Sequence, residues 1–120
     1  MSDPQHGEVS YLQLPAKDID KSATFYREVF GWEFNPGFAP AFDAAGLHGM
    51  LDTGVAPAPS GGPMLWLFVT DIHAATKRAV EFGGTLVEDV VVADDGPRLQ
   101  AVVADPAGNQ LGIWRNSDEA

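Results

Sequence analysis

The sequence predicts an α+β fold made of two tandem βαβββ modules whose mixed sheets curl into cups. Three observations lead to this prediction. Residues 11–31 align with residues 64–84 at a constant offset of 53 positions and without a gap. In each half, an apolar strand pattern precedes a helical pattern that begins after an aspartate and ends at glycine. A segment rich in Pro, Gly and Ser, TGVAPAPSGGP, separates the halves and has the composition of a linker.

The first module covers about residues 8–52 and begins with a strand at Val9–Leu14. A helix follows because the Asp18 carboxylate can accept the free amides of a first turn. Apolar residues then recur at helical spacing, and Gly31 ends the helix as a C-cap. The residues on that helix face are Ile19, Ala23, Tyr26 and Phe30. Three short strands are expected near Trp32–Asn35, Ala41–Ala44 and His48–Asp52.

The second module covers about residues 64–115 and repeats this order after the linker, residues 53–63. A strand at Met64–Val69 leads to a helix capped by Asp71 and ended by Gly83 and Gly84. The apolar face of this helix carries Ile72, Ala75, Ala79 and Phe82. The remaining strands are expected near Thr85–Val91, Leu99–Ala104 and Gln110–Trp114. Together the two modules make a single domain over residues 1–120.

Alternation of side chains along the strands predicts two faces for each sheet. One face packs under the helices and carries Leu12, Leu14, Leu65, Leu67, Leu111 and Ile113. The opposite face has no helix to cover it, which favours a ligand cleft or a subunit interface. We therefore expect ligand-binding residues at Tyr11, Gln13, Leu51, Met64, Trp66, Phe68, Gln110 and Trp114.

The charge and composition narrow the classes of function. Seventeen acidic and seven basic residues give a formal net charge of −10, and there is no cysteine. Such a surface does not suit nucleic acid or anionic membranes, and it attracts cationic small molecules. Disulfides and thiolate metal sites are excluded. The start of the chain lacks the features of a signal peptide, so we expect a cytoplasmic protein.

Three stretches carry a resemblance to a known superfamily: PAKDIDKSATFYREVFGWEF, VTDIHAATKRAVEFGGTLV and VVADPAGNQLGIW. They resemble the vicinal oxygen chelate superfamily, which includes glyoxalase I, extradiol dioxygenases, methylmalonyl-CoA epimerase and the bleomycin and fosfomycin resistance proteins. The likeness is greatest to small glyoxalase-related or bleomycin-resistance-like members. It implies the duplicated fold of that superfamily and a homodimer.

Enzymes of this superfamily hold one divalent metal in the cup of the sheet. The resemblance places the ligand positions at Tyr11 and Met64 on the first strands and at Gly49 and Gly112 on the last strands. None of these residues is a good ligand, so we expect no metal cofactor, with one divalent ion as the alternative. His48 is a weak metal candidate, because strand alternation next to Gly49 places its side chain on the helix-facing side. A glycine at 112 leaves room in the cup for a ligand instead of an ion.

Three functions stay open at this point. The first is a metal-independent protein that binds a small organic molecule, cationic or aromatic, in an aromatic-lined cup. The alternative is a metal-dependent lyase, isomerase or dioxygenase related to glyoxalase I, with lactoylglutathione lyase-like or dioxygenase-like chemistry. The third is a vestigial or regulatory domain. Asp94 and Asp95, with Arg98, form either a solvated turn or a charged lip over the cup.

Overall fold

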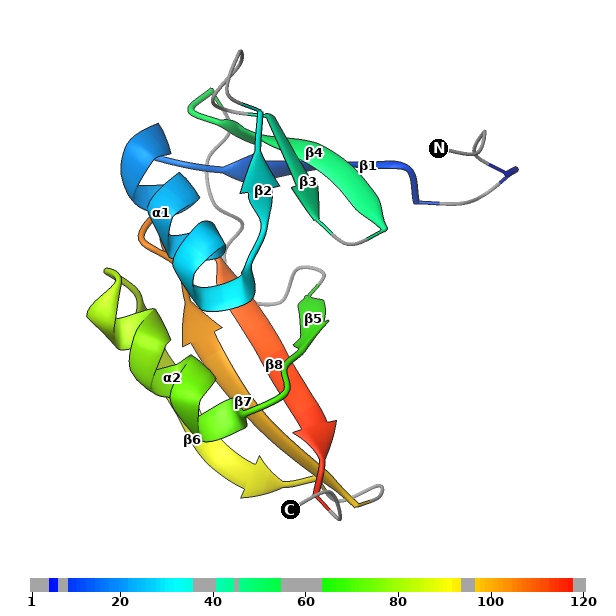
Figure 1. Ribbon diagram of the computed structural model, residues 1–120. Helices are drawn as coiled ribbons and strands as arrows, with labels where there is room; N and C mark the ends of the chain where they lie inside the picture. Colours follow the sequence, from blue (N-terminus) through cyan, green and yellow to red (C-terminus); the bar gives the residue numbers. More distant parts are fainter. Residues whose placement is uncertain are drawn as a thin grey trace.

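Two four-stranded mixed sheets, each with one helix packed against it, make up the computed structural model (Figure 1). The structure describes residues 5–6, 9–35, 41–44, 46–54, 64–93 and 97–117. The first module contains β1 (Tyr11–Pro15), α1 (Ile19–Phe30), β2 (Glu33–Phe34), β3 (Ala41–Ala44) and β4 (Leu47–Asp52). The second contains β5 (Leu65–Phe68), α2 (Ile72–Glu81), β6 (Thr85–Val92), β7 (Arg98–Ala104) and β8 (Gln110–Asn116). The predicted α+β fold with two βαβββ modules is confirmed.

The two sheets have the same strand order. It is β1-β4-β3-β2 in the first sheet and β5-β8-β7-β6 in the second. The first strand of each module pairs in parallel with the last, and the other pairs are antiparallel. Neither sheet closes into a barrel, so each keeps one face free of helices.

The start of each helix and the end of α1 follow the predicted capping residues, whereas α2 ends just before Gly83, with Phe82 as its C-cap. Asp18 and Asp71 accept hydrogen bonds from the backbone amides of Lys21 and Ala74, each at 3.1 Å. Gly31 ends α1 in the left-handed region with φ of 74°, a conformation that favours glycine. Neither helix in the described part of the chain is long and apolar enough to cross a membrane.

One apolar core joins both modules under the two helices. Its largest fully buried side chains are Tyr26, Phe25, Leu51, Ile72, Leu111, Ile113 and Val103. In the first module an aromatic stack extends from Tyr26 to Trp32 and on to Phe42, with ring centroids 4.6 Å and 4.8 Å apart. Because helix and strand contribute rings to the same stack, α1 is fixed against its sheet.

The turn of the second module between β7 and β8 is bound to the first module. The buried Tyr26 hydroxyl donates to Asp105 Oδ2 at 2.6 Å, across 79 positions of sequence. Asn109 Nδ2 donates to the Pro15 carbonyl at 2.7 Å and also to Asp105. Asp105 Oδ1 accepts from the Ala107 and Asn109 amides. The Asp-Pro-Ala-Gly-Asn turn therefore acts as a latch between the modules.

Candidate functional site

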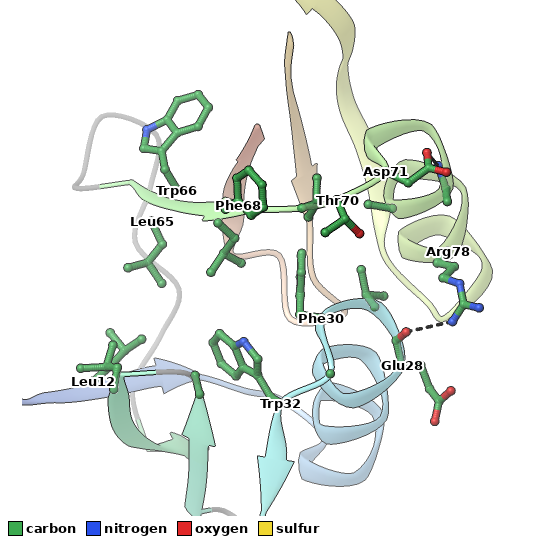
Figure 2. Close-up of a pocket in the computed structure, with 18 residues that line it drawn as sticks. Leu12, Glu28, Phe30, Trp32, Leu65, Trp66, Phe68, Thr70, Asp71 and Arg78 are labelled. Atoms are coloured by element: carbon green, nitrogen blue, oxygen red, sulfur yellow. Dashed lines mark hydrogen bonds between the residues drawn. The ribbon is translucent and has the colours of Figure 1, made fainter. Parts of the chain in front are cut away.

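Three aromatic side chains lie together on the uncovered face of the second sheet. Phe68 pairs across the sheet with Trp114, and their rings meet edge to face with centroids 5.2 Å apart. Trp66 lies two residues earlier on β5, and 47% of its surface is exposed. Figure 2 shows the Trp66 ring on the opposite side of β5 from Leu65. We call Trp66, Phe68 and Trp114 the aromatic patch.

Gly112 lies beneath this patch. It pairs with Trp66 across the parallel strands and is buried, because the Trp66 indole lies over it. A β-carbon at position 112 would overlap three carbons of that ring. The space that the glycine leaves is thus filled by Trp66 and not left open in a cup. A carboxylate at this position is incompatible with the observed orientation of Trp66.

The uncovered face of the first sheet carries a different set of residues. Tyr11 pairs with His48, and His48 pairs with Asp43 on its other side, so all three side chains share one face. The expectation that His48 faces the helices is therefore wrong. Leu12 pairs with Gly49, whereas Leu65 pairs with Leu111, so the last strands of the modules correspond at an offset of 62. Gly49 corresponds to Leu111 and lies under the Phe42 ring.

The remaining predicted ligand-binding residues are placed differently from one another. Leu51 is 1% exposed in the core, because it shares the helix-facing side of β4 with Gly49, and it does not reach either uncovered face. Gln13 is exposed on β1 and donates to Asp52 Oδ2 at 3.1 Å. Met64 and Gln110 are exposed at the start of β5 and β8. Apart from Leu51, the predicted residues thus lie on the outer faces of two different sheets.

The residues at the positions expected for a metal do not fit a divalent ion. Across the described part of the chain, no group of three or more His, Cys, Asp or Glu side chains is close enough to hold one. His48 Nδ1 lies 3.6 Å from Asp43 Oδ1, and this pair provides two donors at most. The pair borders a shallow cavity of about 430 Å³ that Tyr11 also lines. Asp94 and Asp95 lie outside the described residues.

A second cavity in the described structure lies between the modules. Its volume is about 710 Å³, and its walls come from β1, the end of α1, β5 and α2 (Figure 2). The apolar lining includes Leu12, Phe30, Trp32, Leu47, Leu65 and Leu67. Trp66 and Phe68 border it from the other side of β5. Its position depends on how the modules pack, which no local pattern encodes.

Comparisons with known proteins agree with this architecture. Residues 11–114 match the family model of a glyoxalase-like domain. A glyoxylase-like domain-containing protein of Didymella fabae is 32% identical over 98 residues, or 72% of this chain and 76% of that protein. The anthracycline biosynthesis protein DnrV of Streptomyces peucetius is 31% identical, and the match covers 91% of this chain but 47% of that protein. A glyoxalase-related enzyme from Fulvimarina pelagi has a TM-score of 0.71 and 29% identity, with 92% of this chain and 88% of that chain covered. The chain therefore belongs to the glyoxalase-like domain family of the vicinal oxygen chelate superfamily.

Proposed function

We propose that the protein binds a flat, aromatic organic molecule on the aromatic patch, without a resident metal. The observation that carries this proposal is the exposure of Trp66 and Phe68, 47% and 54%, on a sheet face that no helix covers. Large aromatic surfaces held in water by a rigid sheet favour stacking with a second ring system. Because Gly112 has no side chain, the Trp66 ring can lie against the sheet. The stacking surface is therefore already formed before the ligand binds.

The charge of the protein favours a cationic ligand. The net charge of −10 produces a negative field that raises the local concentration of small cations. A ring system that carries an amine combines stacking with this attraction. One relative is named an anthracycline biosynthesis protein, which makes an anthracycline a reasonable first probe.

The direct test is a titration with doxorubicin, a flat anthracycline that carries an amino sugar, followed by calorimetry. Trp66→Ala and Trp114→Ala each remove a stacking surface, so each should weaken binding about tenfold. Val80→Ala is the matched control, because Val80 is equally exposed but lies on α2 away from the patch. Unchanged affinity in both tryptophan variants would show that the patch is not the site.

We also propose that the protein is a homodimer in which a second copy covers part of the uncovered face of the first sheet. Tyr11 on β1 is 55% exposed, and Val9 just before this strand is 74% exposed. Exposed apolar surface of this kind is unusual on a monomer and is stabilised by association. Light scattering coupled to size-exclusion chromatography measures the mass directly, and a mass of 12.8 kDa at micromolar concentration would contradict the dimer.

A metal-dependent lyase, isomerase or dioxygenase is the second candidate function. One observation favours it: His48, Asp43 and Tyr11 share one sheet face, and the imidazole is next to a carboxylate. A metal would supply a Lewis acid at this face. The test is the metal content of the purified protein after incubation with divalent ions and desalting. One metal per chain that is lost in His48→Ala would support the enzyme, and its absence would support the metal-independent protein.

A further inference from the structure

We propose that the cavity between the modules is a second binding site, which adjoins the aromatic patch, and that it takes an amphipathic molecule. This ligand has an apolar chain or ring as its body and one carboxylate at its end. The body lies between the modules, and the carboxylate is bound by Arg78. Trp66 and Phe68 border both sites, but Trp114 lies only in the patch and Arg78 lines only the cavity, so the two proposals can be tested apart.

The size and lining of the cavity suit such a body. Its volume of about 710 Å³ lies within the range of small-molecule sites, roughly 300 to 1,000 Å³. Leu12, Leu65 and Leu67 line it, and each packs against the core while staying only partly buried. Filling the cavity with an apolar group would remove this surface from water, which is favourable.

Arg78 gives the cavity one polar and cationic end. Its Nη1 donates to the Glu28 carbonyl at 3.1 Å, which holds the guanidinium between α1 and α2 (Figure 2). A guanidinium carries five N–H donors, so further donors stay available for a ligand. No carboxylate in the described residues lies within ion-pair distance of Arg78.

Two carboxylates also line the cavity, Glu28 near Arg78 and Asp71 at the start of α2. Glu28 lies 3.6 Å from Arg27, and the Asp71 carboxylate accepts the Ala74 amide as the cap of α2. A ligand carboxylate at Arg78 would form a charge-assisted hydrogen bond, which is among the stronger non-covalent contacts. The net negative charge of the protein opposes this contact weakly, because charges beyond about 8 Å are screened at physiological salt.

The fluorescence of Trp32 can report binding in the cavity, because Trp32 lines it. The chain has only two other tryptophans, Trp66 and Trp114, and both can be replaced. In the double variant Trp66→Phe/Trp114→Phe, all tryptophan fluorescence comes from Trp32. The probes are 11-bromoundecanoate and 11-bromoundecanol, whose bromine quenches an indole on contact. Both should quench Trp32, and the carboxylate should bind about tenfold more tightly than the alcohol.

Two variants and one control distinguish the effect of the Arg78 charge from the effect of the cavity volume. Arg78→Gln in the same background should remove the preference for the carboxylate and leave the alcohol binding unchanged. Lys77→Gln removes the same charge from the neighbouring position of α2, which does not line the cavity, and should keep the preference. Ala74→Phe should fill the cavity and abolish quenching by both probes, with circular dichroism confirming that the variant is folded.

The outcomes decide the proposal in either direction. Saturable quenching of Trp32 with a preference that disappears only in Arg78→Gln supports the site as described. Failure of both probes to quench Trp32 would overturn the proposal, as would an equal carboxylate preference in wild-type and Arg78→Gln backgrounds. Loss of doxorubicin binding in Trp114→Ala concerns the patch alone, because Trp114 does not line the cavity, so the two proposals fail independently.

Discussion

The indole of Trp66 lies directly over Gly112 on the neighbouring strand, and this contact explains why a glycine stands in the middle of β8. Glycine normally weakens a strand, because it has no side chain to pack and loses more backbone entropy. Here the ring supplies the packing that the missing side chain does not. Packing of Trp66 on Gly112 thereby compensates for the missing side chain in β8 and positions one ring of the aromatic patch.

Gly112→Ala should destabilise the fold by about 1 kcal/mol and tilt the Trp66 ring away from the sheet. The loss of stability is small because the new β-carbon meets the half-exposed Trp66 ring, which can move. Urea denaturation measures it. In a Trp66→Ala background the same substitution should cost nothing measurable. An equal cost in both backgrounds would show that a contact other than the Trp66 ring requires the glycine.

Gly49→Ala should destabilise the fold by about 3 kcal/mol or more, which is clearly more than Gly112→Ala. A β-carbon at position 49 would overlap the Leu12 carbonyl oxygen and the ring of Phe42. The first is backbone and the second is 4% exposed in the core, so neither can move aside cheaply. The same urea titration tests this order of stability, and a reversed order would contradict the assigned register of β4.

The fold could be predicted well from the sequence, but the face of the sheet on which each side chain of β4 lies could not. The repeat, the capping aspartates and the apolar alternation predicted all ten elements, because each depends on local chemistry. His48 was misplaced because Gly49 was taken as the counterpart of Gly112, whereas it corresponds to Leu111, one residue away. A shift of one residue moves every side chain of a strand to the other face. Pairing with β1 decides that register, and no pattern within β4 reveals it.

The particular side-chain contacts between the modules could not be predicted either. The Tyr26–Asp105 hydrogen bond joins residues 79 positions apart, and the cavity exists only where the packed modules meet. The Asp-Pro-Ala-Gly-Asn stretch was readable as a turn, since its residues favour turns locally. Its role as a latch follows only from the three-dimensional placement of Tyr26 and Pro15.

The latch predicts a loss of stability at alkaline pH. Burial raises the pKa of the Tyr26 hydroxyl well above its usual range, and the neighbouring Asp105 carboxylate raises it further. The unfolded chain ionises this tyrosine at about pH 10. The stabilisation is therefore fully present below about pH 10 and is lost as the pH rises toward the folded pKa. Urea midpoints measured from about pH 8 to about pH 11 should fall in the wild type.

Tyr26→Phe is the variant that isolates this effect. It should cost about 1 to 2 kcal/mol at neutral pH, because Asp105 keeps its bonds from Ala107 and Asn109. Above about pH 10 the difference between the variant and the wild type should shrink, since the phenylalanine has no proton to lose. A constant difference across the whole pH range would show that Tyr26 stays neutral in both states and that other groups cause the alkaline loss.

Salt should separate the two forces proposed for ligand binding at the aromatic patch. The negative field speeds the approach of a cation and is screened as the Debye length falls from about 30 Å at 0.01 M to about 3 Å at 1 M. Stacking on Trp66 and Trp114 sets the rate of dissociation and responds little to salt. Stopped-flow fluorescence should therefore show an association rate for doxorubicin that falls severalfold with added NaCl and a nearly constant dissociation rate.

The uncharged aglycone of doxorubicin is the control, and its association rate should not change with added NaCl. If its association slows to the same degree, the field of the seventeen acidic residues has no part in capture, and stacking alone has to account for the affinity.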